Sequence, residues 1–96
     1  MRFEWDPEKE LINIKKHGID FRLASKVFDD PNFALIKDRI DETGEQRWHA
    51  IGLASVEEEG ALLVVAHIYR GQNEEEIIRI FSAREASKRE RRLYIQ

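Results

Sequence analysis

Cysteine is absent from the 96 residues of this chain. Neither a disulfide framework nor a cysteine-ligated zinc site can therefore stabilise so small a domain, and a reducing cytoplasm fits this composition. Long hydrophobic runs are also missing, because the longest, ALLVVA at 61–66, is far too short to span a bilayer. The start of the chain, MRFEWDPEKE, has charges where a signal peptide needs an apolar core. We therefore expect a cytoplasmic protein that does not enter a membrane.

Several catalytic motifs are absent as well. The sequence has no G-x-S-x-G, Walker A or dinucleotide-binding glycine pattern, so it gives no support to a serine hydrolase, a nucleotide hydrolase or a dehydrogenase. Its histidines, His17, His49 and His67, are not spaced as metal ligands, and its carboxylates fall in segments expected to be loops and turns. We expect neither a metal nor another cofactor, and a metal-dependent nuclease is the least favoured class.

The sequence does have the composition of one globular domain over residues 1–96, with 42% hydrophobic and 36% charged residues. Its charge is distributed unevenly. Residues 84–96 hold five basic residues and two glutamates, a net charge of +3, which leaves −6 for residues 1–83 of a chain whose total is −3. Because phosphate contacts depend on local charge, nucleic-acid binding through the basic end stays possible despite the acidic total.

The segment DPEKELINIKKHG, residues 6–18, predicts a helix with Asp6 as its N-cap, Pro7 at its first position and Gly18 just beyond its end. Leu11 and Ile14 mark its expected inner face. Two lysines, 15 and 16, fall in its last turn, where the helix dipole favours cations. That capping role is sufficient to explain them, and substrate contact is the alternative.

A second helix should begin at Asp20 and end before Pro31, forming a hairpin with the first. Strands are expected at 2–5, 33–38, 47–55, 61–70 and 76–82. Acidic or glycine-containing turns such as VEEEG and GQNEEE join the later ones. Strands that follow one another closely favour an antiparallel meander for the last four. ALLVVA is apolar at both parities, which predicts a central strand covered on both faces. The expected fold class is α+β.

The C-terminal tract is expected to be a basic helix that starts at Ser82, because Ser82 and Glu85 fit a capping box. One stripe of this helix would hold residues 83, 86, 90 and 93, and the opposite side would hold Arg84, Lys88 and Arg91 or Arg92. Such a run of charge can be a solvated helix face or a ridge that faces phosphates. The sequence leaves both interpretations open.

Arg79 interrupts the apolar strand IIRIF. Alternation places Ile77, Arg79 and Phe81 on one face of that strand. An arginine there either lines a cleft, where its guanidinium can hold a phosphate in a bidentate way, or forms an ion pair with a buried carboxylate. His67 shares a strand face with Tyr69, and it is either a general acid or base or a histidine with satisfied hydrogen bonds.

Six segments occur in an order that resembles BrnT-family toxins: FEWDPEK, NIKKHGIDF, VFDDP, GEQRWHAIG, LLVVAHIYRG and IIRIFSAREASKRERRLY. The resemblance covers nearly the whole chain. It implies a RelE-like fold of two helices, an antiparallel sheet and a C-terminal helix. It also implies a metal-independent ribonuclease toxin that blocks translation, is neutralised by a BrnA-like antitoxin, and binds operator DNA only as the toxin–antitoxin complex.

The resemblance also suggests site residues. Arg70, Arg79 and Arg84 match the arginines of the family's RG, IRI and SAR motifs, and we expect them to hold the phosphate and to stabilise the transition state. His67 or Tyr69 is the expected proton-transfer group. Contacts to the RNA backbone are expected from residues elsewhere, namely Lys16, Lys88 and Arg91. The acidic turn at 71–76 lies close to the arginines in sequence. A toxin that has lost activity, or a non-catalytic module that binds protein or nucleic acid, is therefore the alternative.

Overall fold

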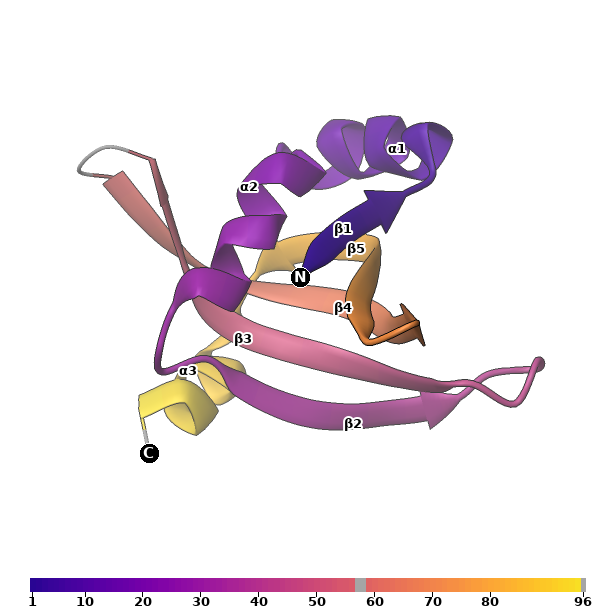
Figure 1. The fold of residues 1–96 in the computed structure, drawn as a ribbon. Helices are drawn as coiled ribbons and strands as arrows, with labels where there is room; N and C mark the ends of the chain where they lie inside the picture. Colours follow the sequence, from indigo (N-terminus) through magenta and orange to yellow (C-terminus); the bar gives the residue numbers. More distant parts are fainter. Residues whose placement is uncertain (57–58, 96) are drawn as a thin grey trace.

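A computed structural model describes residues 1–56 and 59–95 (Figure 1). Over these residues the chain forms a sheet with helices on both sides. The first two of the three glutamates in the expected VEEEG turn, residues 57 and 58, lie outside the described part. The elements in chain order are β1 (Arg2–Trp5), α1 (Pro7–His17), α2 (Phe21–Ser25), the 3₁₀-helix η1 (Lys26–Asp29), β2 (Ala34–Ile40), β3 (Gln46–Val56), β4 (Glu59–Gln72), β5 (Glu75–Glu85) and α3 (Lys88–Ile95).

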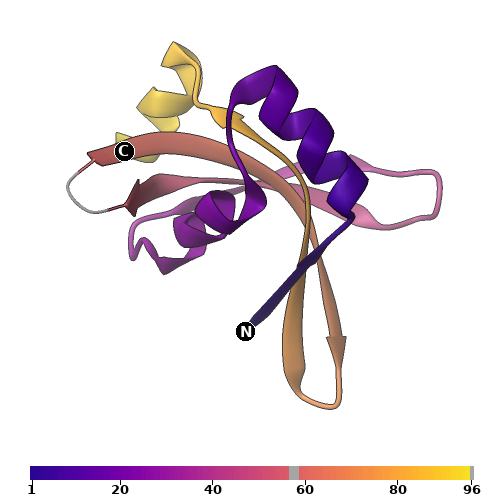
Figure 2. The same cartoon turned by 90° about the horizontal axis from the view of Figure 1, so that it is seen from above.

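The fold class is α+β, with one mixed sheet in the order β1-β5-β4-β3-β2. Strands β2 to β5 pair antiparallel in chain order, as the meander predicted. The sheet is nevertheless larger than that meander, because β1 pairs with β5 in parallel from Arg2↔Ile77 to Trp5↔Ile80. Beyond Ile80 the outer edge of β5 has no partner strand in the described sheet. Figure 2 shows the hairpin of β4 and β5 projecting away from the hairpin of β2 and β3.

The central strand β4 separates two hydrophobic clusters. Leu63 and Val65 point to the larger cluster, which α2 and η1 cover, while Leu62 and Val64 point to a smaller one beneath Tyr94 of α3. Successive residues of a strand face opposite sides of a sheet, so a run that is apolar at both parities fits between two covered faces. The prediction that ALLVVA forms such a strand is confirmed.

Helix α1 begins and ends as predicted, but its inner face differs. The Asp6 carboxylate accepts from the Glu8 amide at 2.9 Å, and Gly18 closes the helix with φ 71°. Leu11 and Ile14, the predicted inner residues, are 65% and 40% exposed, and that prediction is wrong. The buried residue is Asn13, because α1 meets the sheet through polar contacts at an edge.

The contact between α1 and β5 is made by the Asn13 amide. Its Nδ2 donates to the carbonyls of Ile19 and Ala83 at 2.9 Å each, and its Oδ1 accepts from the Ala83 amide at 3.0 Å. A side-chain amide has the same donor and acceptor as a backbone peptide, so Asn13 replaces the partner strand that β5 lacks beyond Ile80.

The predicted hairpin of two helices is present only in part. Asp20 caps α2 by accepting from the Leu23 amide at 2.7 Å, as predicted. The α-helix then ends at Ser25 and continues as a 3₁₀-helix to Asp29. The second helix is therefore too short to pair along the length of α1.

The C-terminal helix starts later than the sequence analysis predicted. Residues 82–85 still belong to β5 and pair with β4, from Ala66↔Ser82 to Leu63↔Glu85. The capping box is formed instead by the next S-x-x-E match, in which Ser87 Oγ accepts from the Glu90 amide and Glu90 Oε1 accepts from the Ser87 amide. The predicted start at Ser82 is wrong, because sheet pairing and the Asn13 bonds hold this segment extended.

Asp30, the residue that follows η1, anchors helix α3. The Tyr94 hydroxyl donates to Asp30 Oδ2 at 2.6 Å, and the Leu53 amide donates to the same oxygen at 2.8 Å. Burial alone would raise the pKa of Asp30, but these hydrogen bonds outweigh it and the pKa is lowered.

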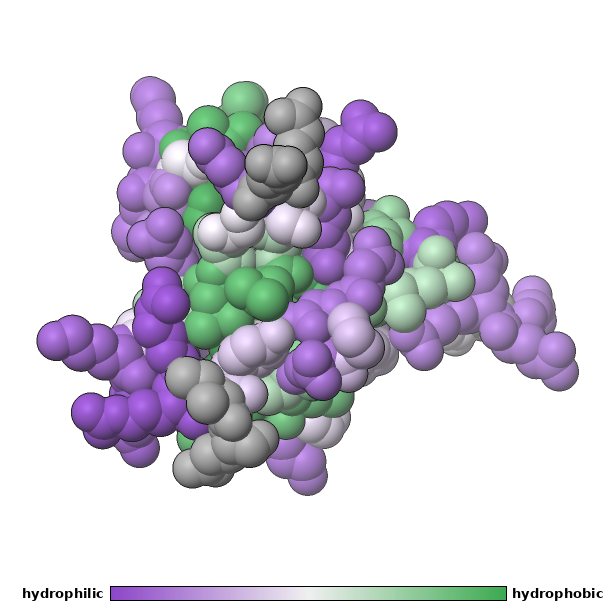
Figure 3. Space-filling model, turned by 90° about the vertical axis from the view of Figure 1, so that its left-hand side faces the viewer, coloured by the Kyte–Doolittle hydropathy of each residue, from purple (hydrophilic) through white to green (hydrophobic). Residues whose placement is uncertain are grey.

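Figure 3 shows a band of hydrophobic residues on this side of the molecule, bordered by hydrophilic ones. Over the described residues, no helix has the length and apolar character needed to cross a membrane.

Candidate functional site

A β-bulge brings the three candidate arginines to one face of the sheet. Ile80 pairs with His67 and Ser82 with Ala66, so Phe81 is an extra residue without a partner. Arg79 pairs with Ile68, and Arg84 pairs with Val64, four residues away along β4. Paired residues share a face, so Arg79 and Arg84 lie on the same side, together with Arg70. Strict alternation would have placed Arg84 opposite Arg79.

Arg70 and Arg79 share one carboxylate at the end of the sheet that carries the β4–β5 hairpin, which we call the hairpin end. Glu4 Oε1 lies 3.6 Å from Arg79 and 4.0 Å from Arg70. The register explains the contact, because Glu4 pairs directly with Arg79. A second glutamate, Glu45, lines the same depression as Glu4 and Arg70. The guanidinium charges at this end are therefore largely balanced by carboxylates.

Arg84 is held in a fixed orientation by Glu90 of α3. Its two terminal nitrogens donate to the two Glu90 oxygens at 2.7 and 2.8 Å, a bidentate pair, and one of them also reaches the Glu85 carbonyl at 3.3 Å. The bonds from Arg84 lower the pKa of Glu90 to about 2, and the same contact raises the pKa of Arg84. These contacts use three of the five guanidinium donors, so the group is oriented while part of it stays available.

His67 does not lie beside the arginines. It is fully buried on the opposite face of β4, against the rings of Phe28 and Tyr69 at centroid distances of 4.9 and 5.0 Å. Nδ1 bonds to the Val65 carbonyl at 3.0 Å, which requires the proton on Nδ1, and Nε2 has no hydrogen-bond partner among the described residues. Burial lowers the pKa of His67, so the ring is neutral.

Tyr69 shares that face with His67, as the sequence predicted, and the structure separates it from Arg79 and Arg84. It is half-buried, and burial followed by the nearby Glu76 charge raises its pKa. Tyr69 does line the depression at the hairpin end beside Arg70. The predicted site is therefore divided: Arg79 and Arg84 lie on one side of the sheet, His67 is buried on the other, and Tyr69 meets only Arg70.

A groove of about 500 Å³ lies between α1 and the bulged part of β5, and we call it the α1–β5 groove. Ser82 and Arg84 contribute from the strand. The helix contributes a stripe at the spacing i, i+3, i+4, i+7, i+8, which is one face of a helix. The lining residues are Lys9, Ile12, Asn13, Lys16, His17, Phe81, Ser82 and Arg84.

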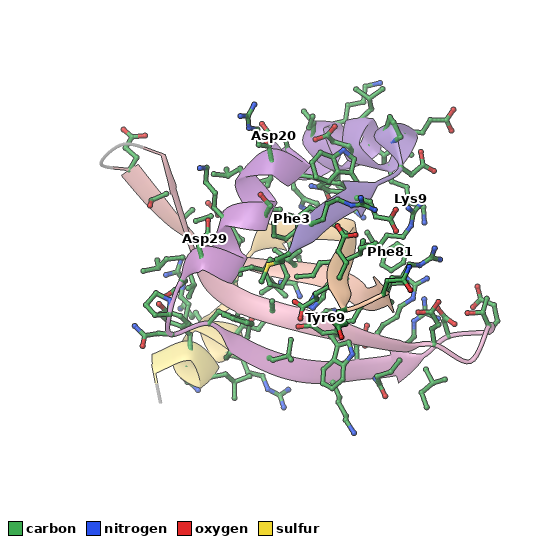
Figure 4. All side chains as sticks on the ribbon, viewed as in Figure 1. Phe3, Lys9, Asp20, Asp29, Tyr69 and Phe81 are labelled. Carbon is green, nitrogen blue, oxygen red and sulfur yellow. The ribbon has the colours of Figure 1, made fainter. Side chains whose placement is uncertain are left out.

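Phe81, the bulge residue, lines this groove and holds two cations against its ring. The Lys9 ammonium lies 5.1 Å and the Arg47 guanidinium 4.1 Å from the ring centroid, both within cation–π range. Arg47 is fixed further by Asp41 at 3.1 Å. Figure 4 shows Lys9 and Phe81 close together, with Tyr69 apart from both.

The sequence analysis identified two lining residues of the groove, Lys16 and Arg84, as site residues. It did not assign Lys9 or Arg47 to the site, and it interpreted His17 as a residue of the helix C-terminus and not as a site residue. The spacing of Lys9, Lys16 and His17 on one helix was the available signal. The other predicted RNA contacts, Lys88 and Arg91, are exposed residues of α3. In the described part of the chain, no group of three or more histidines and carboxylates is arranged to hold a metal ion.

Comparison with known protein families gives one finding. Residues 5–90 match the profile of a family described as "Ribonuclease toxin, BrnT, of type II toxin-antitoxin system". The match covers most of the chain and includes the α1–β5 groove and the arginines of β4 and β5. No curated protein sequence matches the chain.

Proposed function

The chain belongs to the BrnT family of ribonuclease toxins of type II toxin–antitoxin systems, and from this premise we propose that it cleaves RNA without a metal ion and so inhibits translation. The observation that carries this proposal is the bulge at Phe81, which places Arg79 and Arg84 on one face of the sheet. Arg79 is 28% exposed, so part of its guanidinium is open to a ligand.

RNA cleavage without a metal requires two things from a protein. The ribose 2′-hydroxyl must be held in line with its phosphate, and the negative charge that develops on the pentacoordinate phosphorus must be stabilised. Arginine suits the second task, because its planar guanidinium is permanently charged and can donate two parallel hydrogen bonds to phosphate oxygens. We assign this role to Arg79 and Arg84, with Arg70 at the margin of the site.

Proton transfer is assigned to His17 rather than to His67 or Tyr69. His17 is exposed and lines the α1–β5 groove with Lys16 and Arg84. When the 2′-oxygen bonds to phosphorus, the hydroxyl gives up its proton to solvent, the bond from phosphorus to the 5′-oxygen breaks, and that 5′-oxygen needs a proton. A histidine can supply one near neutral pH. The buried, neutral His67 has no path to a substrate on the arginine face.

The partner of a type II toxin is an antitoxin. We propose a BrnA-like protein in this role, and operator DNA as a ligand of the toxin–antitoxin complex alone, acting in the cytoplasm. We also propose that the fold is RelE-like, which two N-terminal helices, a sheet and a C-terminal helix support. If co-expression of a small acidic protein encoded next to this chain fails to restore growth, the antitoxin assignment is wrong.

The test of the proposed activity is cleavage of single-stranded RNA by the purified chain in the presence of a chelator. We expect cleavage to persist with chelator and to fall about 10²- to 10³-fold in Arg79→Ala, which removes one transition-state charge. His17→Gln should bind RNA normally and cleave it slowly. Arg39→Ala is the matched control, because Arg39 is an exposed arginine of β2 that contacts only Glu42 among the described salt bridges.

Three results would count against the proposed activity. Cleavage that stops with chelator would show a metal requirement. Equal activity of folded Arg79→Ala and Arg39→Ala would remove Arg79 from the site. RNA that is bound but never cleaved would favour a binding module or an inactive toxin.

A further inference from the structure

We infer that the α1–β5 groove is the binding site for the RNA backbone, and that the phosphodiester lies between Lys16 and Arg84. This inference rests on the proposed function and specifies where its substrate binds. Of the two predicted arginines at the hairpin end, Arg79 then faces this phosphate from the same side of the sheet as Arg84, and Arg70 lies outside the main phosphate site.

The first argument is charge. The lining of the groove includes Lys9, Lys16 and Arg84 and no aspartate or glutamate among the described residues. The depression at the hairpin end is lined by one arginine, Arg70, and by two glutamates. A phosphate carries one negative charge, so it is attracted to the first surface, where two lysines remain after Arg84 is paired with Glu90. It gains little attraction from the second, where carboxylates balance the guanidinium charges.

The second argument is that the cations of the groove are held in place. Glu90 orients the Arg84 guanidinium by a bidentate pair at 2.7 and 2.8 Å, and the Phe81 ring holds the Lys9 ammonium at 5.1 Å. Asn13 fixes the distance between the two walls, because its amide bonds to Ala83 on β5. Groups that are oriented in advance lose less conformational entropy when a ligand binds.

The third argument is the shape and size of the groove. Its volume of about 500 Å³ lies within the range of about 300–1,000 Å³ for sites that enclose small ligands, so a nucleotide fits. The Ser82 hydroxyl lines its strand wall and can donate to a phosphate oxygen. Its lining includes Phe81, the bulge residue between Arg79 and Arg84 on β5, and the Phe81 ring also carries the Arg47 guanidinium. An RNA strand in the groove would therefore lead toward Arg79.

Neighbouring lysines on α1 provide a matched test. Lys15 and Lys16 are both exposed, but only Lys16 lines the groove. The probe is a single-stranded 2′-O-methyl RNA oligonucleotide, which has the phosphates of RNA but cannot be cleaved through a 2′-hydroxyl. Its affinity is measured by fluorescence anisotropy over a range of salt concentrations for the wild type, Lys16→Gln and Lys15→Gln.

We expect Lys16→Gln to weaken binding about five- to tenfold, and to reduce the slope of log affinity against log salt by about 0.7, the value for one lost contact to a single strand. Lys15→Gln should change affinity less than about twofold, since it alters only the net charge. Equal effects of the two substitutions on affinity and slope would overturn the inference.

A second pair tests the groove with introduced charge. Leu11 and Ile12 are 65% and 64% exposed, and only Ile12 lines the groove. Ile12→Glu should therefore abolish most of the RNA binding, and Leu11→Glu should leave most of it intact. If Leu11→Glu weakens binding as much as Ile12→Glu, the groove is not the site, and an acidic protein partner becomes the better occupant.

The outcome for the groove can be separated from the outcome for the proposed activity. RNA cleavage that depends on Arg79, combined with equal binding by the two lysine variants, would overturn the groove assignment and leave the ribonuclease proposal standing. Groove-dependent binding without any cleavage would support the assignment and contradict the proposed activity. Circular dichroism and thermal melting of every variant exclude unfolding as the cause of a loss.

Discussion

The two ends of the arginine face differ in what surrounds each guanidinium. At the hairpin end, Glu4 lies between Arg70 and Arg79, and Glu45 is close by. At the groove end, Arg84 also has a carboxylate partner, but Lys9 and Lys16 lie in the same groove and neither forms a salt bridge within the described part of the chain. The number of arginines is therefore a poor guide to a phosphate site, and the balance of charge around them is a better one.

The carboxylates at the two ends also do different things. Glu4 is shared by two arginines at 3.6 and 4.0 Å, distances that are long for a hydrogen bond. Glu90 makes two short bonds to one arginine and also caps α3. We interpret Glu4 as a counter-charge and Glu90 as a group that positions Arg84. Substitutions at the two ends should therefore have different consequences.

The largest expected difference is in the rate of RNA cleavage, between substitutions of Arg84 at the groove end and Arg70 at the hairpin end. Arg84→Ala should slow single-turnover RNA cleavage about 10²-fold, because it removes an oriented charge from the transition state. Arg70→Ala should slow it less than about threefold, because Arg70 is 53% exposed and balanced by Glu4.

The control for this pair is Glu90→Gln, which breaks the same ion pair and keeps the arginine. If Glu90→Gln slowed cleavage as much as Arg84→Ala, the orientation of Arg84 and the placement of α3 would account for the loss, and the presence of the guanidinium alone would not. A larger loss in Arg70→Ala than in Arg84→Ala would reverse the comparison between the two ends.

The next largest expected effect is on the free energy of unfolding. It comes from Asn13, whose side-chain amide joins the two walls of the groove. Asn13→Asp replaces a buried donor with an acceptor that faces two carbonyl oxygens. We expect a loss of about 3 kcal/mol in the free energy of unfolding, because buried groups lose their hydrogen bonds or a charge is buried without a partner. Urea unfolding measures this loss. Asn32→Asp makes the same chemical change at an exposed position and should cost less than about 0.5 kcal/mol.

Comparable losses in these two variants would show that the Asn13 bonds do not support the fold. The position of α1 against β5, and with it the shape of the groove, would then need another explanation.

The smallest expected effect is on the free energy of unfolding at acidic pH, and it comes from the Arg84–Glu90 pair. The bonds from Arg84 hold the pKa of Glu90 at about 2, below its ordinary value of 4.5. Since the pKa is lowered in the folded state, ionised Glu90 stabilises the fold above pH 4.5, and this contribution is lost as the pH falls toward 2. Glu90→Gln should cost about 1 kcal/mol at neutral pH and should lose less stability than the wild type on acidification.

Urea unfolding of both proteins at neutral pH and at about pH 3 gives this difference, since the upper part of the window, from pH 4.5 to pH 3, lies within that interval. Parallel loss of stability in the wild type and in Glu90→Gln would mean that the Arg84–Glu90 pair is not formed in solution.

Local patterns predicted much of the fold. The caps at Asp6, Gly18 and Asp20 depend on neighbouring residues only, and each was predicted at its observed position. The double-sided apolar pattern of ALLVVA gave the central strand for a similar reason. The start of α3 was wrong because Ser82 and Ser87 both fit a capping box, and the choice depends on pairing with β4, which is distant in sequence.

The face assignments of the candidate site could not be predicted from alternation. The extra residue Phe81 shifts the alternation of β5 by one position, so that Arg84 lies on the same face of the sheet as Arg79. The role of Asn13 was also invisible, because a polar residue between Ile12 and Ile14 has no pattern that marks it as buried. Lys9, Lys16 and His17 did have helical spacing, and a search for charged stripes would have found them.

The central claim is that RNA binds at the groove end of the arginine face, and backbone chemical shifts test it most directly. The ¹⁵N-labelled protein is titrated with the 2′-O-methyl RNA oligonucleotide, and the amide shifts are followed. We predict the largest changes at Lys16, His17, Ser82 and Arg84, with small changes at Arg70 and Ile77. Large changes at Arg70 and Ile77, together with an unchanged groove, would contradict the account.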